Sequence, residues 1–426
     1  MSSAIENRSI AEIMDEIGRA ARSAAADLAQ SSAEQRNQAL RLAAAAIREQ
    51  AEKILAANEN DMRSARAKSV NNAMLDRLAL DSGRVEAMAA GLEEIGDLPD
   101  PVGKVLAKWQ RPNGLQIERI SVPLGVIGII YESRPNVTAD AAGLCLKSGN
   151  AVILRGGSES FNSGQAIYRC LRVGLEKAGM NPAVVQLVPT TDRDAVGYLL
   201  SSMIEYLDVV VPRGGKNLIK RVQEEARVPV IGHLEGICHV YLHESADLEM
   251  AKNIVLNAKM RRTGICGAAE TLLIDRAAAE RLLPDVAAEL IAAGCEIRGD
   301  QQAREILPTA DAATEADWST EYLEAVISVR IVENLAQATE HIRHYGSGHT
   351  ECIVADDQAA AEQFLRQVDS AILLHNASTQ FADGGEFGMG AEIGIATGRI
   401  HARGPVGAEQ LTSYKYVVRG SGQTRP

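Results

Sequence analysis

One cysteine in this sequence stands among residues that could make it a nucleophile. Cys266 closely follows Lys259, Arg261 and Arg262, in a segment between an expected helix and an expected strand. Nearby positive charge and exposed backbone N–H groups lower the pKa of a thiol, so more of it is thiolate at neutral pH. Neighbouring glycines let a substrate approach the backbone closely. We therefore expect a nucleophilic thiolate, and the alternative is a small buried side chain.

Two glycine pairs follow expected strands and precede expected helices. They lie in Arg155-Gly-Gly-Ser158 and in Arg213-Gly214-Gly215-Lys216. Backbone N–H groups at the start of a helix bind phosphate, so two such loops suit the two ends of a dinucleotide. Simple turns are the alternative, because neither loop matches the GxGxxG or the Walker pattern.

Three histidines, His233, His239 and His243, surround Glu235 and raise the question of a metal site. Their spacing matches no common zinc pattern, and no carboxylate-rich surround is visible. We expect no metal centre and interpret them as single histidines with ordinary hydrogen bonds.

A glycine-rich segment, Asn376–Gly394, also contains Phe381, Phe387 and Met389. Ordered loops of this length usually serve a site, so we expect a functional loop here. A disordered surface loop is the alternative.

Helices and short apolar strands must position these residues. The spacing of apolar residues predicts several long amphipathic helices from Ser9 to Ala90, and alternation predicts half-exposed strands at 115–122 and 411–418, the second an edge strand. Between them we expect strands at 125–131, 151–154, 184–188, 207–211, 240–242, 271–274 and 325–332, and helices at 137–146, 163–178, 192–200, 216–226, 248–259, 277–293 and 334–345. This alternation predicts an α/β protein with parallel sheets, whose ligands lie at the carboxyl ends of the strands.

Composition excludes several classes of protein. The 426 residues carry 44 Lys and Arg against 56 Asp and Glu, a net charge of −12, so we expect no nucleic acid and no anionic membrane as a partner. The six cysteines are scattered singly, which fits a reducing compartment. No secretion signal and no membrane span is visible, so we expect a cytoplasmic protein of two or three domains.

Four motifs together resemble the aldehyde dehydrogenase superfamily. They are Val122–Thr138, Leu234–Tyr241, Cys266 with 268–271, and Asn376–Gly394 with His401–Pro405. The resemblance implies an aldehyde dehydrogenase-like fold, with two α/β domains of parallel-rich sheets and a β oligomerisation arm. The implied parts are a cofactor domain of residues 1–108 and 123–232, a catalytic domain of residues 233–406, and an arm of residues 109–122 and 407–426. A homo-oligomer is implied as well.

Within the superfamily, the motifs are similar to those of a branch that reduces L-glutamyl 5-phosphate with NADPH. The product is L-glutamate 5-semialdehyde, phosphate is released, and the step belongs to proline biosynthesis. This resemblance implies L-glutamyl 5-phosphate as substrate and NADPH/NADP as cofactor, and it admits the upstream glutamate kinase as a protein partner. A hydrolytic or CoA-acylating aldehyde dehydrogenase is the alternative.

The resemblance also implies roles for residues around the reacting carbon. Cys266 would form a thioester, and Asn136 with the Cys266 backbone N–H would form the oxyanion hole. Substrate contacts are expected from Arg134, Ser378 and Thr379, from their positions in the matching motifs.

Other residues are implied to hold the cofactor. Arg155 and Ser158 would contact the adenosine ribose and the extra phosphate of NADPH, Gly214 and Gly215 the pyrophosphate, and Glu321 the nicotinamide ribose. One departure concerns Glu235. It stands in Leu-Glu-Gly-Ile, whereas hydrolytic members carry Glu-Leu-Gly-Gly with a glutamate that activates water, so a role as base stays open.

Overall fold

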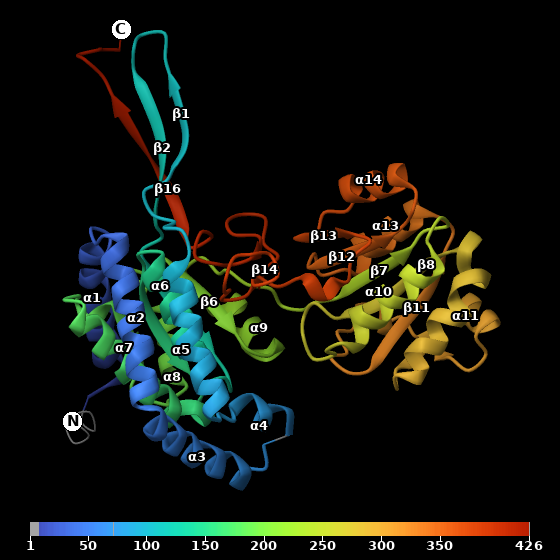
Figure 1. Cartoon of the computed structure of the whole chain (residues 1–426), viewed down its shortest axis with the longest axis horizontal. Coiled ribbons are helices and arrows are strands. Elements are labelled where there is room, and N and C mark those ends of the chain that lie inside the picture. Colours follow the sequence, from blue (N-terminus) through green and yellow to red (C-terminus); the bar gives the residue numbers. More distant parts are fainter. Residues whose placement is uncertain (1–7, 71, 426) are drawn as a thin grey trace. The chain divides into compact units, whose positions relative to one another are not determined.

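A computed structural model describes residues 8–70 and 72–425, which form two compact units (Figure 1). The first unit runs from the start of the described chain to Gly232 and adds Gly388–Gly394 and the chain from Val406 onward. The second unit holds His233–Phe387 and Ile395–Pro405. The expected catalytic domain, 233–406, included Gly388–Gly394. That segment lies in the first unit, where Ile393 N–H donates to Val406 O at 2.9 Å.

Helices dominate the start of the first unit. Ser9 begins α1 with a capping box, because its side chain accepts from Glu12 N–H while the Glu12 carboxylate accepts from Ser9 N–H. The helices are α1 Ile10–Leu28, α2 Ala33–Glu49, α3 Ala51–Ala67, α4 Asn72–Leu78 and α5 Ser82–Asp97. The prediction of a helical N-terminal region is confirmed.

A four-stranded parallel sheet forms the core of the first unit, in the order β5-β4-β3-β6. Its strands are β3 Val126–Tyr131, β4 Ala151–Gly156, β5 Val185–Leu187 and β6 Val209–Arg213, and its helices are α6 Val137–Lys147, α7 Phe161–Lys177, α8 Asp194–Ser201 and α9 Lys216–Glu225. Tyr131 is in register with both Gly156 and Arg213. The segments that follow β3, β4 and β6 therefore leave the same carboxyl edge side by side.

A three-stranded antiparallel sheet also belongs to the first unit. It consists of β1 Val105–Gln110, β2 Gln116–Pro123 and β16 Thr412–Arg419, with β2 in the middle. The two strands expected near 115–122 and 411–418 are confirmed, and β1 is an addition that the sequence did not reveal. Apolar side chains on the outer strands are exposed, such as Val105 and Tyr416 at 56% each. An oligomerisation role for this sheet stays a prediction.

A seven-stranded parallel sheet forms the second unit, in the order β10-β9-β11-β8-β7-β12-β13. Its strands are β7 Cys238–Leu242, β8 Ala269–Asp275, β9 Glu296–Gly299, β10 Asp311–Ala312, β11 Val326–Val332, β12 Thr350–Val354 and β13 Ile372–His375. Its helices are α10 Leu248–Met260, α11 Arg276–Ala292, α12 Gln301–Ile306, α13 Leu335–Tyr345 and α14 Gln358–Gln367. A short pair, β14 Ile395–Ala396 and β15 Gly404–Pro405, is antiparallel.

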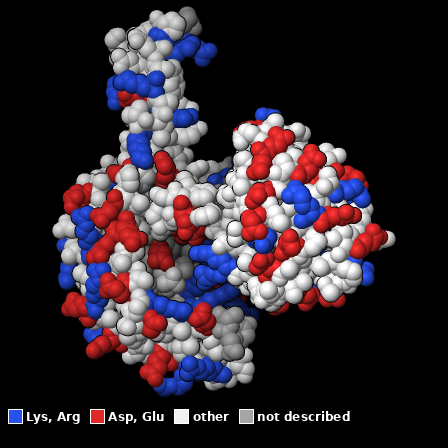
Figure 2. Space-filling view, turned by 45° about the vertical axis from the view of Figure 1, so that its right-hand side comes forward, with Lys and Arg blue, Asp and Glu red and all other residues white. Residues whose placement is uncertain are grey.

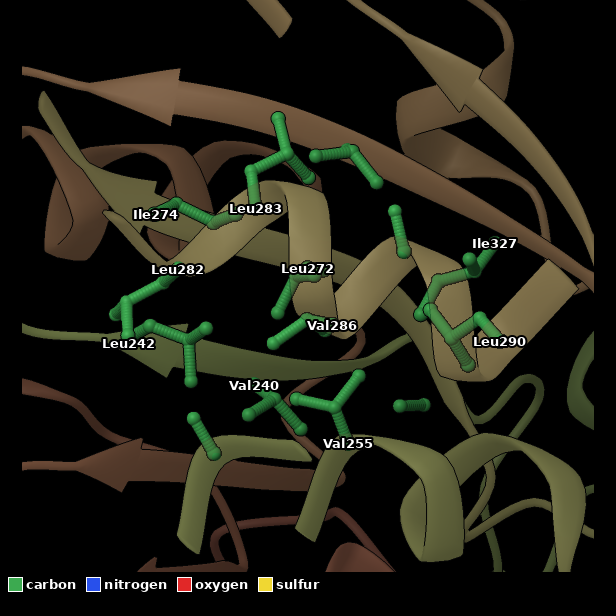
Figure 3. Close-up of a cluster of buried hydrophobic side chains, with 14 of the residues drawn as sticks. Val240, Leu242, Val255, Leu272, Ile274, Leu282, Leu283, Val286, Leu290 and Ile327 are labelled. Carbon is green, nitrogen blue, oxygen red and sulfur yellow. The ribbon is translucent and has the colours of Figure 1, made fainter. Parts of the chain in front are cut away.

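The core of the second unit packs helices α10 and α11 against strands β7 and β8. Figure 3 shows Val255 of α10 and Val286 of α11 facing Val240 and Leu272 of the sheet, and all four side chains are buried. Continuous apolar strands of this kind belong to sheets with both faces covered. The predicted α/β class with parallel-rich sheets is confirmed.

The surface carries acidic groups on both units, as Figure 2 shows for the face in view. Such a distribution follows from the net charge of −12. Among the helices that the structure describes, none is both long enough and apolar enough to cross a membrane.

Candidate active site

Cys266 lies in the loop between α10 and β8, three residues before β8 begins. It is half-buried, whereas the other five cysteines are buried. A nucleophile must be reachable by its substrate, and a structural cysteine is usually enclosed. Cys266 is therefore more accessible than the buried cysteines, and its role as a nucleophile stays a prediction.

Close backbone packing fixes the position of Cys266. A Cβ atom built on Gly236 would lie 2.1 Å from the carbonyl oxygen of Cys266, so no residue but glycine fits without a shift of the backbone. The Cys238 thiol donates to that same carbonyl oxygen over 3.1 Å. The segment just before β7 thus holds the segment just before β8.

A buried ion pair anchors both ends of the loop 261–268, which contains Cys266 and is called the nucleophile loop. Lys259 Nζ at the end of α10 lies 2.5 Å from Glu270 Oε2 in β8, and both residues are almost fully buried. The other Glu270 oxygen accepts from Leu323 N–H over 3.3 Å. Burial raises the pKa of Glu270 to about 7, and Lys259 opposes that rise. Lys259 was expected to lend positive charge to Cys266, but Glu270 neutralises that charge.

Ser378 and Thr379 lie beside the nucleophile loop. The carbonyl oxygen of Thr379 is 3.1 Å from a Cβ built on Gly267. Gln380 holds this segment by donating through Nε2 to the carbonyl oxygens of Ala258, at 2.8 Å, and of Arg262, at 3.3 Å. The Thr379 hydroxyl is buried and has no hydrogen-bond partner among the described residues.

Glu321 reaches the same place from the segment before β11. Its Oε1 accepts from Gly236 N–H over 2.8 Å, and Gly236 packs directly on Cys266. The structure therefore gathers Glu321 and Cys266 around one glycine. The role of Glu321 toward a nicotinamide ribose stays a prediction.

The histidines separate into different environments. His239 Nδ1 is 2.8 Å from Glu351 Oε2, and His243 Nδ1 is 2.9 Å from Ser245 Oγ. His233 packs edge-on against His349 with ring centroids 4.7 Å apart. His349 was not singled out from the sequence. Burial, with a smaller contribution from His233, holds the pKa of His349 well below its usual range, so the imidazole is neutral.

In the first unit, Asn136 is the N-cap of α6, at the end of the short loop that follows β3. Its side-chain amide donates to Asp140 Oδ2 over 2.8 Å, which fixes the direction of the carboxamide. Burial raises the pKa of Asp140 to about 6, against the lowering effect of Asn136. Arg134 lies two residues earlier, where its carbonyl oxygen accepts from Val137 N–H.

Arg155, at the end of β4, has its guanidinium turned into the protein. Its Nη1 donates to Gly156 O, and its Nη2 donates to the carbonyl oxygens of Thr191 and Asp192 at 3.1 Å each. Its Nε is buried without a hydrogen-bond partner among the described residues. Ser158 is exposed at the start of the following 3₁₀ turn, Ser158–Ser160. A cofactor contact from Arg155 stays a prediction, and its visible contacts hold the loop at 191–192.

Gly214 and Gly215 are exposed just before α9. The Gly215 N–H donates to Glu132 Oε2 over 2.8 Å, and a Cβ on Gly214 would lie 2.5 Å from that oxygen. Glu132 was not singled out, although it lies within the motif Val122–Thr138. The Glu132 carboxylate thus accepts a hydrogen bond from the Gly215 N–H group, which we expected to face a pyrophosphate.

These loops fit a dinucleotide in several respects. Helix α9 begins at an exposed glycine pair followed by Lys216, and the 3₁₀ turn that leads into α7 begins at an exposed serine. The unpartnered Nε of Arg155 is a buried donor beside one of the two loops. A pyrophosphate that binds to the Gly215 N–H group would have to displace the Glu132 carboxylate from it.

Comparisons with known proteins agree with this fold. A sequence profile described as the aldehyde dehydrogenase family matches residues 6–313. The chain belongs to the aldehyde dehydrogenase family, whose members are oxidoreductases. The resemblance that the motifs indicated is confirmed.

More specific similarity is to proteins named gamma-glutamyl phosphate reductase. The protein of that name from Parvibaculum lavamentivorans is 60% identical over 421 residues, 99% of each chain. The one from Rhodopseudomonas palustris is 62% identical over 417 residues, 98% of this chain and 97% of that one. The crystal structure of the Thermotoga maritima protein of that name matches with a TM-score of 0.95 at 43% identity, covering 97% of this chain and 100% of that chain. An acetylating aldehyde dehydrogenase from Geobacillus thermoglucosidasius shares the fold, with a TM-score of 0.67 at 18% identity over 99% of this chain and 100% of that chain.

Proposed function

We propose that this protein reduces L-glutamyl 5-phosphate to L-glutamate 5-semialdehyde with NADPH and releases phosphate, a step of proline biosynthesis. The observation that carries the proposal is the half-buried Cys266, held by Gly236, in a chain similar over nearly its whole length to proteins named gamma-glutamyl phosphate reductase.

The chemistry begins with acyl transfer to Cys266. The thiolate attacks the acyl carbon, a carbon–sulfur bond forms, and the bond from carbon to the phosphate oxygen breaks, with its electron pair leaving on phosphate. Addition of hydride to the thioester carbon gives the oxyanion of a thiohemiacetal. When its carbon–sulfur bond breaks, the aldehyde leaves and the Cys266 thiolate is restored.

Negative charge develops on the acyl oxygen in both addition steps. The Asn136 carboxamide and the Cys266 backbone N–H are the proposed donors, and loss of one such donor typically costs about 3 kcal/mol of transition-state stabilisation. Asp140 is the proposed positioning residue, because it accepts from the Asn136 amide and limits its rotation.

NADPH supplies the hydride when it is bound. Gly214 and Gly215 would hold its pyrophosphate, Ser158 and Arg155 its adenosine end, and Glu321 its nicotinamide ribose. Arg193 is a further candidate for the extra phosphate, because it is exposed and lies close enough to Arg155 for the like charges to repel. Burial and, to a smaller extent, this repulsion lower the pKa of Arg155. We propose a homo-oligomer in the cytoplasm, joined through the sheet of β1, β2 and β16, and the upstream glutamate kinase as a candidate protein partner.

Arg134, Ser378 and Thr379 are the proposed contacts to the amino and carboxylate ends of the substrate. The support is strongest for Thr379, whose buried hydroxyl lacks a partner among the described residues and whose backbone touches the nucleophile loop. A substrate group that bonded to this hydroxyl would remove the cost of leaving it unsatisfied.

The reverse reaction tests the proposal against a hydrolytic or a CoA-acylating enzyme. Glutamate 5-semialdehyde and NADP⁺ would be supplied with phosphate, with coenzyme A, or with neither. Turnover that requires phosphate supports the reductase. Equal rates without phosphate would mean that water resolves the thioester and would assign Glu235 the role of base. Turnover only with coenzyme A would make the chain an acylating dehydrogenase.

A further inference from the structure

We propose that Cys266, His233 and His349 form a binding site for a soft divalent cation such as Zn²⁺, which inhibits the enzyme reversibly by capturing its nucleophile. One ligand atom from each of these three residues lies within 4.8 Å of the other two. This set differs from the three histidines that stand close in the sequence, since His349 replaces His239 and His243 and a thiol joins the histidines.

The chemistry of the three donors suits zinc. Imidazole nitrogen and thiolate sulfur are its preferred ligands, at about 2.1 and 2.3 Å, so donors around a tetrahedral ion lie roughly 3.3–3.7 Å apart. Contraction from 4.8 Å needs shifts of about 1 Å, which side-chain rotation can supply. Three protein ligands leave the fourth position to water.

The histidine rings are oriented for ligation. His233 Nδ1 lies 2.6 Å from Ile395 O, and His349 Nδ1 lies 2.8 Å from Thr350 Oγ1. Because Nδ1 of each ring is engaged, Nε2 is the nitrogen that would bind the ion. Carbonyl and hydroxyl groups behind a ligating histidine commonly set its tautomer in this way.

The burial of His349 is evidence for the cation site that does not depend on the distances between the donors. The residue is fully buried, and its Nε2 has no hydrogen-bond partner among the described residues. A buried polar atom without a partner costs free energy that a ligand can recover. His349 has no step in the proposed reduction, so the reductase chemistry does not account for this ring.

Coordination would remove the thiol proton to solvent and block attack on the acyl phosphate, because the sulfur electron pair would be engaged. Binding of the cation does not depend on the proposed reduction. Only the resulting inhibition does, so the two proposals can fail separately.

Cobalt is the probe for this site, because Zn²⁺ is spectroscopically silent and Co²⁺ accepts the same tetrahedral donors. Titration of the full chain, freed of metal by a chelator, is expected to give one Co²⁺ per chain, intense visible bands of a tetrahedral ion and a thiolate-to-cobalt charge-transfer band. Cys266→Ser should abolish that band, and His349→Gln should weaken binding by at least about 100-fold. Zn²⁺ should displace the cobalt.

Cys170→Ser and His344→Gln are the matched controls, a buried cysteine in α7 and an exposed histidine in α13, and both should bind Co²⁺ like the original chain. Should His349→Gln not fold, His233→Gln takes its place. Absence of the charge-transfer band, or a band that survives Cys266→Ser, would overturn the proposal. If the band behaves as expected but phosphate-dependent turnover is absent, the metal site stands and the proposed reduction fails.

Discussion

Most candidate site residues follow the strands of the first sheet, whereas most of those in the second unit precede the strands of the second sheet. In the first unit, the glycine loops and Asn136 follow the carboxyl ends of β3, β4 and β6. In the second unit, Glu321, Cys266, Gly236 and His349 all precede strands, and those strands are neighbours in the order β11-β8-β7-β12. In the second sheet these candidate residues therefore lie at the amino ends of the strands, whereas a parallel sheet is expected to bind ligands at the carboxyl ends.

This difference changes the electrostatics of the two regions. A carboxyl edge is followed by helix N-termini, which carry partial positive charge and suit phosphate. The nucleophile loop follows the C-terminus of α10, whose carbonyl groups are partly satisfied by Gln380, and Lys259 is paired with Glu270. A thiolate at Cys266 would therefore gain no stabilisation from the N-terminus of a helix.

Replacing the nucleophile should have the largest effect. Cys266→Ser is expected to lower the reduction rate by at least about 1,000-fold, because serine is a far weaker nucleophile at neutral pH. NADPH affinity should change less than twofold if the carboxyl edge of the first sheet holds the cofactor. Stopped-flow assays and fluorescence titration would measure both quantities. Cys170→Ser is the control, and an active Cys266→Ser chain would contradict the account.

The second-largest effect is expected at the Lys259–Glu270 ion pair, which anchors the nucleophile loop. Lys259→Met should lower the free energy of unfolding by about 3–5 kcal/mol, because it removes the positive charge that pairs with the buried Glu270 carboxylate and leaves only the Leu323 N–H as a partner. Urea denaturation would measure the loss. Lys252→Met is the control, because Lys252 pairs with exposed Glu249 and should cost less than about 1 kcal/mol. Equal losses of unfolding free energy in the two variants would mean that burial of the Lys259–Glu270 pair does not add to its effect on stability.

A pH profile tests the burial of Asp140. Its pKa of about 6 exceeds the ordinary 3.8, so the folded chain holds this proton more tightly than the unfolded chain. The stability from this group is complete below about pH 4 and is lost as pH rises through 6. The Asp140→Asn variant has no carboxyl group to ionise at this position, so it should not lose this stability as the pH rises. Its stability relative to the original chain should rise by about 1–3 kcal/mol between pH 4 and 7.5.

Urea denaturation at each pH would measure this change, with exposed Asp285→Asn of α11 as the control. A stability difference that stays constant with pH would refute the raised pKa of Asp140.

The smallest effect concerns the carboxylate at the second glycine loop. Glu132→Gln should tighten NADPH binding about fivefold, because it removes a negative charge beside the expected pyrophosphate site, worth about 1 kcal/mol. Fluorescence titration would measure it, with exposed Glu224→Gln of α9 as the control. Weaker binding would show that Glu132 supports the loop instead of competing with the cofactor.

Sequence patterns predicted all four strands of the first sheet but only three of the seven in the second, β7, β8 and β11, where apolar runs alternate with amphipathic helices. Strand β12 was missed since Glu351 interrupts its apolar run, and that carboxylate is fully buried because His239 on β7 supplies its partner. Such a pairing between distant strands leaves no local pattern. Strand β1 was missed because nearly all of its residues are exposed.

Site residues could be predicted from the sequence where they belong to a recognisable pattern. A single residue that only the fold brings to the site could not. Cys266 belongs to one of the motifs and Glu321 was implied by the family resemblance, and the structure gathers both around Gly236. His349 stands in a Gly-Ser-Gly-His segment with no chemical signature, and the parallel register of β12 beside β7 brings it to the nucleophile. Arg155 has a local pattern typical of a phosphate contact, but its carbonyl partners come from residues 191 and 192.

The mass of the chain after a single turnover tests the central claim most directly. Glutamate 5-semialdehyde and NADP⁺ without phosphate should produce one NADPH per active chain and leave one glutamyl group as a thioester on the peptide that contains Cys266. Added phosphate should remove the group. A chain without an adduct, or with one that persists in Cys266→Ser, would contradict the assignment of Cys266 as the acyl carrier.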